Sequence, residues 1–453
     1  MITTMHYLFP HQVEIINKAM YKRQYALLCD MGTGKTRCAI ELIKRTRDNW
    51  QLPIKALVIA PNTILENWLA EIKKWSSLNA VILQGTKAKR LKLLKEPADV
   101  YIINYEALRL LEPDLIAKQF NMIIADESQK LKGYKTLQSK AAFRIGQKAW
   151  YRIIMSGTPI TNNPLDIFGQ YRFLNPFIFG FSYYKFRSRY CIMGGYLNFE
   201  VKKWINLDEL HDKVYSCAIR YKKEDCLSLP EKLYEVQQVD LTEDQKRVYK
   251  QLKTEFISEL AGKVVSAPYV LTRLLRLSQV TAGFVKDTEA IEINFATNPK
   301  LVLLKEIIEN LPKEEKVVVF CRFIKEIHNV IWLCQENKWT WSGIWGETKD
   351  RQNQVNQFND GNVKVFIGQV ETAGLGINLH TARYCIFLSN SYSHGSRLQC
   401  EDRLHRIGQK NAVTYIDIVA RNTIDLTVLS CLKDKKDLAT QVIEEIKNES
   451  MAK

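Results

Sequence analysis

Short runs of β-forming residues alternate with segments of helical period in two separate stretches of the chain. In the first stretch, apolar runs that end in polar or glycine-containing turns indicate buried strands at residues 25–29, 56–60, 100–103, 122–125 and 151–155. The pattern returns near the C-terminus at residues 316–321, 364–367, 384–388 and 413–418. Strands that alternate with helices in this way form parallel sheets with helices on both faces. The sequence therefore predicts an α/β fold with two parallel-sheet units.

The region between these two units has a different pattern. It begins with a segment rich in aromatic side chains: Phe173, Phe177, Phe179, Phe181, Tyr183, Tyr184 and Phe186. It then becomes helical, and residues 242–245 (Thr-Glu-Asp-Gln) have the form of a capping box that opens an amphipathic run to about residue 260. We therefore predict three regions: a first α/β unit at residues 1–165, a mainly helical insertion at 166–297 and a second α/β unit at 298–453.

The first predicted strand leads into a glycine-containing loop, residues 30–36 (DMGTGKT), and then into an apolar-periodic helix. This arrangement suits a bound triphosphate, because glycines let backbone N–H groups wrap the phosphates at a helix N-terminus. Lys35 would reach the β- and γ-phosphate oxygens, and the Thr36 hydroxyl would ligate Mg²⁺. The strict phosphate-loop pattern is not met, since Cys29 stands where its first glycine belongs. The alternative is a glycine-rich turn with a solvated lysine.

An acidic pair, Asp126 and Glu127, follows the predicted strand at residues 122–125. The carboxyl end of a strand in an open α/β sheet is where ligands bind. Asp126 can hold Mg²⁺ through water, and Glu127 can orient an attacking water molecule. A solvated Asp-Glu turn is the alternative for an isolated pair, but a phosphate loop precedes this one in the same predicted sheet. Together the two features favour ATP hydrolysis with Mg²⁺.

Two arginines near the C-terminus, Arg403 and Arg406, are three residues apart and would share one face of a helix. An arginine presented by a second domain can neutralise charge on the transferring γ-phosphoryl group, so that hydrolysis depends on domain closure. Without the other motifs, both would be interpreted as surface charges.

Lysine and arginine number 65 against 49 aspartates and glutamates, a formal net charge of +16. Such a surplus is typical of proteins with a polyanionic partner, although a basic enzyme of another kind is the alternative.

The ten cysteines include no C-x-x-C pair, so we predict neither a zinc site nor a disulfide scaffold. The first ten residues lack the pattern of a signal peptide, and no apolar run is long enough to span a bilayer. We expect a soluble protein of the cytoplasm.

Further motifs stand in a fixed order along the chain: residues 8–12, 30–36, 58–62 with 67–68 and 74–75, 103–106, 126–132, 156–163, 318–323, 371–379 and 402–409. In this order they resemble the Q motif and motifs I, Ia, Ib, II, III, IV, V and VI of the Snf-type family of superfamily II helicases and DNA translocases. The resemblance covers nearly the whole chain. It implies two tandem RecA-like lobes with parallel sheets, a helical insertion, and a DNA-stimulated ATPase that uses ATP and Mg²⁺.

The resemblance also assigns roles to residues. Lys35, Asp126, Glu127, Arg403 and Arg406 would be catalytic, and Thr36 and Asp126 would hold the metal. Nucleotide-binding residues would be Gln12, which would read adenine, with Met31, Gly32, Thr33, Gly34, Lys35, Thr36 and Gly376. Coupling of hydrolysis to movement would involve Gln129, Ser156, Gly157 and Thr158. Contacts to the DNA backbone would come from Asn62, Asn104 and Thr372, without strong sequence preference.

Three departures from the family pattern stand out. Gln129 replaces the usual histidine of motif II, so we expect the link from the γ-phosphate site to motif III to differ. Glu371 and Thr372 stand where the family tends to carry arginine or lysine, and Leu375 follows Gly374 in place of a second glycine. We therefore expect the grip of motif V on DNA to differ as well.

Residues 186–191, 206–220 and 229–232 resemble the annealing or fork-remodelling subgroup of this family, which acts on branched DNA. We therefore predict a compact, monomeric helicase of a phage or bacterium that acts on forked or four-way DNA, with roles in DNA replication, recombination or repair. The aromatic segment would either pack as a helical core, which we favour, or stack on unpaired bases. The alternatives are a duplex translocase without strand separation, an RNA helicase and a nucleotide-gated DNA-binding scaffold without turnover.

Overall fold

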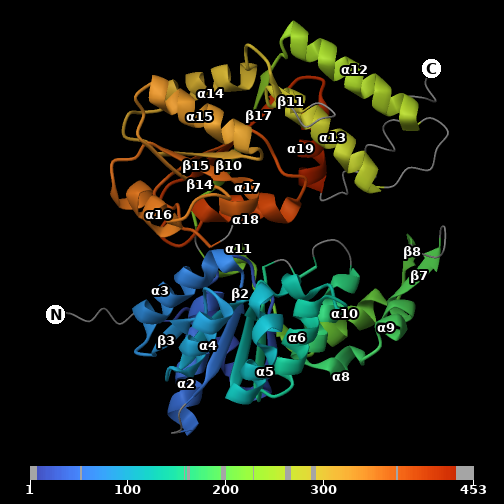
Figure 1. Ribbon diagram of the computed structural model, residues 1–453, viewed down its shortest axis with the longest axis vertical. Coiled ribbons are helices and arrows are strands. Elements are labelled where there is room, and N and C mark those ends of the chain that lie inside the picture. Colours follow the sequence, from blue (N-terminus) through green and yellow to red (C-terminus); the bar gives the residue numbers. More distant parts are fainter. Residues whose placement is uncertain are drawn as a thin grey trace. The chain divides into compact units, whose positions relative to one another are not determined.

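The computed structural model describes residues 8–50, 54–157, 159–160, 164–194, 200–227, 229–260, 267–286, 292–373 and 376–434. The chain forms two compact units, residues 1–228 and residues 229–453. In Figure 1 the first unit runs from blue to green and the second from green to red. The dividing point lies inside the region where the sequence predicts a separate insertion.

The first unit is built on a seven-stranded sheet with the strand order β3-β4-β2-β5-β6-β1-β9. Every neighbouring pair in this sheet is parallel. The strands are β1 Gln24–Leu27, β2 Ala56–Ala60, β3 Ala80–Ile82, β4 Val100–Asn104, β5 Met122–Asp126, β6 Tyr151–Met155 and β9 Ala218–Ile219. Strands β2, β4, β5 and β6 are buried along their whole length, as expected for a parallel sheet with two covered faces.

Helices connect these strands and continue beyond β6. The α-helices are α1 Pro10–Lys22, α2 Lys35–Trp50, α3 Leu65–Trp75, α4 Lys87–Lys95, α5 Leu108–Lys118, α6 Leu137–Gly146, α7 Ile167–Leu174, α8 Pro176–Phe179, α9 Tyr183–Tyr190, α10 Leu207–Tyr215 and α11 Lys223–Cys226. Short 3-10 helices are η1 Asn62–Ile64, η2 Tyr105–Ala107, η3 Ser128–Leu131 and η4 Pro164–Asp166. An antiparallel pair, β7 Cys191–Gly194 and β8 Glu200–Trp204, follows α9.

The second unit has a six-stranded parallel sheet with the order β10-β17-β16-β13-β15-β14. Its strands are β10 Lys232–Val239, β13 Val317–Cys321, β14 Trp341–Ile344, β15 Val365–Gln369, β16 Tyr384–Phe387 and β17 Val413–Ala420. Its helices are α12 Glu243–Leu260, α13 Ala267–Thr281, α14 Pro299–Asn310, α15 Ile324–Glu336, α16 Arg351–Asp360, α17 Val370–Ala373, α18 His394–Leu404 and α19 Ile424–Asp434. A short antiparallel pair, β11 Phe284–Lys286 and β12 Glu292–Asn294, completes it.

Side chains of β13 show how this second sheet is buried on both faces. Val318 and Phe320 belong to one buried cluster, whereas Val317, Val319 and Cys321 belong to another. Because successive side chains of a strand point to opposite faces, the two clusters are the two cores above and below the sheet. The fold class predicted from the sequence, an α/β chain with two parallel-sheet units, is therefore confirmed.

The predicted insertion contributes to both units. Strand β9 pairs with β1 in the first sheet, and β10 pairs with β17 along its whole length in the second. Helices α12, α13 and α19 share a buried apolar cluster in the second unit, and they lie side by side in Figure 1. The predicted capping box of α12 is confirmed, since the Gln245 N–H donates to Thr242 Oγ1 and the Thr242 N–H donates to Gln245 Oε1.

Candidate active site

The loop between β1 and α2 has the conformation of a phosphate-binding loop. Gly32 and Gly34 have backbone φ angles of 81° and 85°, which residues with a Cβ atom rarely adopt. Helix α2 begins at Lys35, so the free N–H groups of its first turn face the loop. The Lys35 Nζ donates to the carbonyl oxygens of Cys29 (2.7 Å) and Asp30 (2.9 Å), which folds this ammonium back over the loop. The partly exposed Thr36 follows it in the first turn.

The start of α1 is packed against this loop. The Gln12 Nε2 and the His11 Nε2 both donate to the carbonyl oxygen of Thr33, at 3.3 and 2.9 Å. A Cβ on Gly34 would lie 2.2 Å from Gln12 Nε2, so only glycine fits there. The Gln12 Oε1 accepts from the Phe9 N–H. Gln12 is therefore buried and holds the phosphate loop in place, and its reading of adenine stays a prediction.

The acidic pair lies at the carboxyl end of β5. Asp126 is buried, and its carboxylate accepts hydrogen bonds from Trp68 Nε1 (2.9 Å) and from the Glu127 N–H (3.0 Å). Its pKa is raised to about 7, first by burial and then by the Glu127 charge; the Trp68 hydrogen bond and the Lys35 charge act in the opposite direction. Glu127 adopts a left-handed conformation with φ 52°, a form of backbone strain that is concentrated at functional sites.

Gln129 connects this acidic pair to the segment that follows β6. Its Nε2 donates to Glu127 Oε2 at 2.7 Å, and its Oε1 accepts from Ser156 Oγ at 2.8 Å. The Gln129 amide donates one hydrogen bond and accepts another, and a neutral histidine, with one protonated and one unprotonated ring nitrogen, can do the same. Gln129 thus joins the residues that we predicted to couple hydrolysis to movement.

Motif III is also in contact with the phosphate loop. The Ser156 N–H donates to the Leu27 carbonyl oxygen, and a Cβ on Gly157 would approach Met31 to 3.1 Å. The structure therefore brings motifs I, II and III together at one edge of the sheet. Thr158, the remaining predicted coupling residue, lies outside the described residues.

A second glutamine, which the sequence analysis missed, makes a parallel bridge. Gln170 of α7 is fully buried; its Oε1 accepts from Ser128 Oγ at 2.7 Å, and its Nε2 donates to the Pro159 carbonyl oxygen at 2.5 Å. Next to it, a Cβ on Gly169 would lie 2.1 Å from the Leu131 carbonyl oxygen. Helix α7 therefore packs directly on η3, the turn that carries Gln129.

In the second unit the two predicted arginines converge on one acceptor. Arg403 and Arg406 each donate from NH1 to the Ile377 carbonyl oxygen, at 3.3 and 3.2 Å. Sharing of one face required both arginines to be helical, but α18 ends at Leu404 and Arg406 lies beyond it, so the two do not share a helical face. What brings the guanidinium groups together is their common contact with the motif V segment.

A buried ion-pair network fixes α18 to the second sheet. Arg397 donates to both carboxylate oxygens of Asp417 on β17 and to Glu401 on its own helix. Glu401 also accepts from Lys232 and Tyr234 of β10. Because each buried charge has a partner, the network holds α18 in a defined position, and with it Arg403.

The predicted DNA contacts have different surroundings. Asn62 is exposed at the start of η1, after β2. Asn104 is buried, and its amide is engaged by Arg90 and Glu106. Thr372 is partly exposed on α17 and donates to Gln369 Oε1. DNA binding by these three residues stays a prediction.

The altered motif V lies partly outside the described residues, which include neither Gly374 nor Leu375. Gly376 is described and has a φ of 73°, a conformation that favours glycine. Its predicted contact with the nucleotide is not tested by this geometry.

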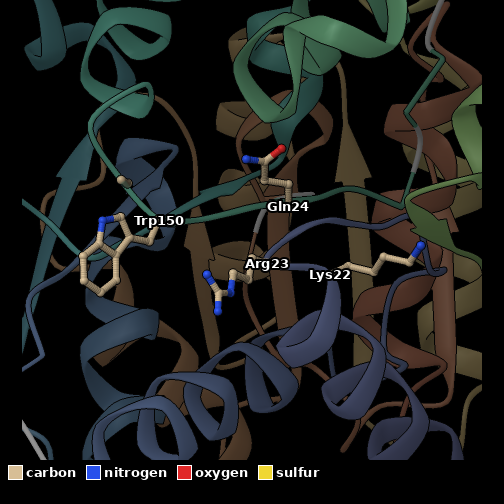
Figure 2. Close-up of a pocket in the computed structure, with 5 residues that line it drawn as sticks. Lys22, Arg23, Gln24 and Trp150 are labelled. Carbon is tan, nitrogen blue, oxygen red and sulfur yellow. The ribbon is translucent and has the colours of Figure 1, made fainter. Parts of the chain in front are cut away.

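A surface hollow of the first unit lies away from these motifs. Figure 2 shows its lining, with Arg23 between the side chains of Trp150 and Lys22. Gln24 begins β1 and Trp150 precedes β6, so the hollow is at the amino ends of these parallel strands. The phosphate loop follows the carboxyl end of β1, so the hollow does not belong to the candidate active site.

The oxygen donors at the site fit Mg²⁺. A hydroxyl from Thr36 and a carboxylate from Asp126 are ligand types that this cation prefers. A bound divalent cation would also relieve the cost of burying the Asp126 charge. Within the part of the chain that the structure describes, no cluster of three or more His, Cys, Asp or Glu side chains forms another metal site. No helix in that part is long and apolar enough to cross a membrane.

Comparisons with known proteins agree with the order of motifs. Residues 11–283 match the model of the SNF2-related domain, and residues 299–408 match that of the helicase conserved C-terminal domain. The human DNA annealing helicase and endonuclease ZRANB3 is 28% identical over 455 residues, which cover 94% of this chain and 40% of that protein. The ISWI chromatin-remodeling complex ATPase ISW1 of Saccharomyces cerevisiae is 26% identical over 465 residues, 96% of this chain and 40% of the relative.

An uncharacterized ATP-dependent helicase of Mycoplasma genitalium, MG018, is 26% identical and covers 92% of this chain and 40% of its own length. The chain thus spans about two fifths of the length of these curated relatives. Among solved structures, the Sulfolobus solfataricus SWI2/SNF2 ATPase core in complex with dsDNA has 24% identity and a TM-score of 0.46, covering 97% of this chain and 93% of that one.

Proposed function

Because the chain belongs to the SNF2-related family and carries a helicase C-terminal domain behind its SNF2-related domain, we propose that it is an ATP-driven motor that moves on DNA. The observation that carries this proposal is the hydrogen-bonded connection of Glu127, Gln129 and Ser156 beside the phosphate loop. A nucleotide-binding scaffold without turnover would not need a water-activating carboxylate held by a neighbour that also reaches motif III.

Residues of the first unit would bind and activate ATP. Backbone N–H groups of residues 31–34 and the start of α2 would hold the phosphates, and the Lys35 ammonium would move from the Cys29 and Asp30 carbonyls to the β- and γ-phosphate oxygens. Mg²⁺, held by Thr36 and by Asp126 through water, would neutralise charge on the phosphates. Glu127 would orient the attacking water molecule, and its hydrogen bond from Gln129 fixes the direction of its carboxylate.

Residues of the second unit would complete the reaction. Arg403 and Arg406 are held together at the Ile377 carbonyl, so one movement of the second unit would deliver or withdraw both guanidinium groups. An arginine supplied in this way stabilises the charge of the transition state, worth about 10³–10⁵ in rate in other phosphoryl-transfer enzymes. Hydrolysis would then depend on closure of the two units, which is what a motor requires.

Gln129 and Gln170 would pass the state of the nucleotide to the rest of the first unit. Both glutamines connect η3 to the segment after β6, through Ser156 and Pro159. Loss of the γ-phosphate changes the charge that Glu127 faces, and the amide of Gln129 transfers this change to Ser156. These contacts support a coupling role for motif III.

For the DNA substrate, we infer that the motor acts on branched DNA, in replication, recombination or repair. The relatives include DNA annealing helicases of 27–28% identity over 94% of this chain. The net charge of +16 fits a nucleic-acid partner, and we expect a monomer in a bacterial or phage-infected cytoplasm.

A second candidate is a duplex translocase that displaces proteins or twists DNA without separating strands. A chromatin-remodeling ATPase is 26% identical over 96% of this chain, almost the same identity as that of the annealing helicases, and this likeness favours the duplex translocase. A strand-displacement assay on forked, four-way and blunt DNA distinguishes the two. Faster release of strands from forked and four-way DNA supports the branched-DNA helicase, whereas ATP hydrolysis without release on any substrate supports the translocase.

The site assignment is tested with two variants. Lys35→Ala and Glu127→Gln should reduce DNA-stimulated phosphate release to background while the thermal melting curve stays that of the wild type. Lys18→Ala, which removes an exposed lysine of α1, is the matched control and should remain fully active. Full activity of either site variant would refute the assignment.

A further inference from the structure

Three large aromatic side chains of the first unit lie exposed within one short stretch of chain. Phe177 is 80% exposed, Phe181 58% and Tyr184 60%. The rings of Phe177 and Phe181 pack edge to face, with centroids 5.7 Å apart. By contrast, Phe173 and Phe186 of the same aromatic segment are buried. The structure therefore divides this segment into a core part and a surface part, where the sequence analysis favoured core packing for all of it.

Buried and half-buried rings next to the exposed ones pack against one another and form a support. Tyr183 stacks on Tyr134 with centroids 4.3 Å apart, and it meets Phe168 edge to face at 5.4 Å. Phe179 and Phe186 are also edge to face, at 5.0 Å. Figure 1 shows α8, which carries Phe177, next to α9, which carries Tyr184, and Phe181 lies in the connection between them. Side chains on such a support lose little freedom when a ligand binds to them.

The two stretches of chain that carry these rings and their support contain basic residues and no acidic ones. Residues 130–140 contain four lysines, residues 176–190 contain one lysine and two arginines, and neither stretch contains an aspartate or glutamate. The Lys135 Nζ lies 5.8 Å from the ring centroids of both Tyr134 and Tyr184, and the Arg187 guanidinium lies 5.4 Å from that of Tyr184. Arg189 differs, because it pairs with Glu209. We name Lys135, Phe177, Phe181, Tyr184 and Arg187 the aromatic–cation surface.

From this combination we infer that the aromatic–cation surface binds an unpaired DNA strand, with bases stacked on Phe177, Phe181 and Tyr184 and phosphates beside Lys135 and Arg187. Every base offers a π-face to an aromatic ring, so such stacking needs no particular sequence. The absence of acidic residues from both stretches favours a polyanionic partner, and a nucleic-acid strand combines that charge with bases that stack on exposed rings. The inference rests on the proposed action on DNA and names the part of the substrate that this surface takes.

The surface is also linked to the candidate active site. Tyr134 and Lys135 follow directly after η3, which carries Gln129, and Gly169 of α7 packs on the Leu131 carbonyl of the same turn. Phe168, in the support beneath the exposed rings, precedes Gly169 and Gln170 on α7. Packing of Tyr134 on Phe168 and Tyr183 therefore connects the aromatic–cation surface to the turn that carries Gln129.

The test compares the Phe177→Ala/Tyr184→Ala double variant of the full chain with the wild type. Fluorescence anisotropy measures its binding to a single strand, to a duplex with single-stranded tails and to the same duplex with blunt ends. We expect affinity for the single strand and the tailed duplex to fall about tenfold or more, since each stacked base contributes that much in other proteins. Affinity for the blunt duplex, and its stimulation of ATP hydrolysis, should stay within about twofold.

Tyr21→Ala is the matched control, because Tyr21 is an exposed aromatic (84%) elsewhere in the same unit, on α1. It should leave all three affinities unchanged. A Lys135→Ala/Arg187→Ala variant, which keeps the three rings, should weaken single-strand binding most at low salt. Comparison of melting curves identifies any variant that fails to fold, and the charge variant then tests the surface independently.

Two results would overturn the inference. One is unchanged single-strand binding by both double variants, which would leave the surface to a protein partner. The other is an equal loss on all three DNAs, which would make it a general duplex contact. Failure of the proposed function is separate, because it would appear in the wild type as ATP hydrolysis that no DNA stimulates, whatever the surface variants bind.

Discussion

Replacing Gln129 with glutamate changes one amide group into a carboxylate and leaves the size of the side chain almost unchanged. The new carboxyl group can still accept the Ser156 hydroxyl, but in its ionised form it cannot donate to Glu127 as the Gln129 amide does at 2.7 Å. The variant therefore removes one half of the bridge and keeps the other half. It tests whether the hydrogen bond to Glu127, and not the packing of residue 129, supports hydrolysis.

The size of the effect follows from the geometry. A hydrogen bond to a charged group contributes about 1.5–3 kcal/mol. Two carboxylates about 3–4 Å apart repel each other by roughly 4–6 kcal/mol at an effective dielectric constant of 20. This repulsion raises the pKa of one member of the pair by about three to four units, so that near pH 7 the two carboxyl groups share a proton. Glu127 then carries this proton for part of the time and is no longer a permanently ionised carboxylate held in one orientation.

We therefore expect Gln129→Glu to lower the kcat of DNA-stimulated phosphate release by about 100-fold at pH 7, a loss of roughly 2.7 kcal/mol of transition-state stabilisation. Gln129→His is the matched control, because a neutral imidazole can donate to Glu127 and accept from Ser156, and it should stay within a few-fold of the wild type. Both variants should melt at the wild-type temperature within a few degrees. A Gln129→Glu protein that hydrolyses ATP within twofold of the wild type would refute the reasoning.

Three further predictions follow from other contacts. Arg406→Ala should still bind ATP, measured with a fluorescent analogue, but lose about 1,000-fold or more in turnover, and normal turnover would remove this residue from the reaction. Trp68→Phe removes a donor to the Asp126 carboxylate, whose pKa is already raised to about 7. Because Asp126 acts when ionised, the acid limb of the kcat/KM profile should move up by about one to two pH units, and an unmoved limb would contradict the assignment. Gly169→Ala would place a Cβ 2.1 Å from the Leu131 carbonyl oxygen, so the free energy of unfolding should fall by about 1–3 kcal/mol in denaturant titrations, and unchanged stability would show that α7 and η3 can separate.

The features that the sequence predicts well are those encoded within a few neighbouring residues. The phosphate loop follows from two glycines and a Lys-Thr pair between a strand and a helix. The acidic pair follows from its place directly after the buried strand β5. All nine predicted strands are present, and their ends differ by no more than two residues from those predicted, because their apolar runs are continuous and each is followed by a turn signal.

The strands that the sequence analysis missed are short or lie at the edges of the sheets. Strand β9 has two residues and β3 three. Strand β10 has eight, but it lies at the edge of the sheet and pairs only with β17, and most of its side chains are exposed. An edge strand needs no apolar run, and so it leaves little signal in the sequence. Both β9 and β10 lie in the predicted insertion and are edge strands of the first and the second sheet. Because neither is marked by an apolar run, the sequence does not show that the insertion is divided between the two units.

Long-range contacts of the candidate site could not be predicted either. Trp68 and Asp126 are 58 residues apart, and Ser128 and Gln170 are 42 apart. Their hydrogen bonds depend on how α3 and α7 pack on the sheet, which no local pattern encodes. The end of α18 at Leu404 is a further example, because the contact that joins Arg403 and Arg406 is made by a carbonyl of another segment. Likewise, the composition of the aromatic segment does not indicate which rings face water.

The central claim is that binding of DNA by this chain drives ATP hydrolysis at the site built around Lys35 and Glu127. Its most direct test is steady-state phosphate release by the wild-type chain without nucleic acid, with duplex or forked DNA, and with RNA. We expect at least tenfold stimulation by DNA, little by RNA, and none in Glu127→Gln. A wild-type rate that DNA leaves unchanged, or a Glu127→Gln rate equal to that of the wild type, would contradict it.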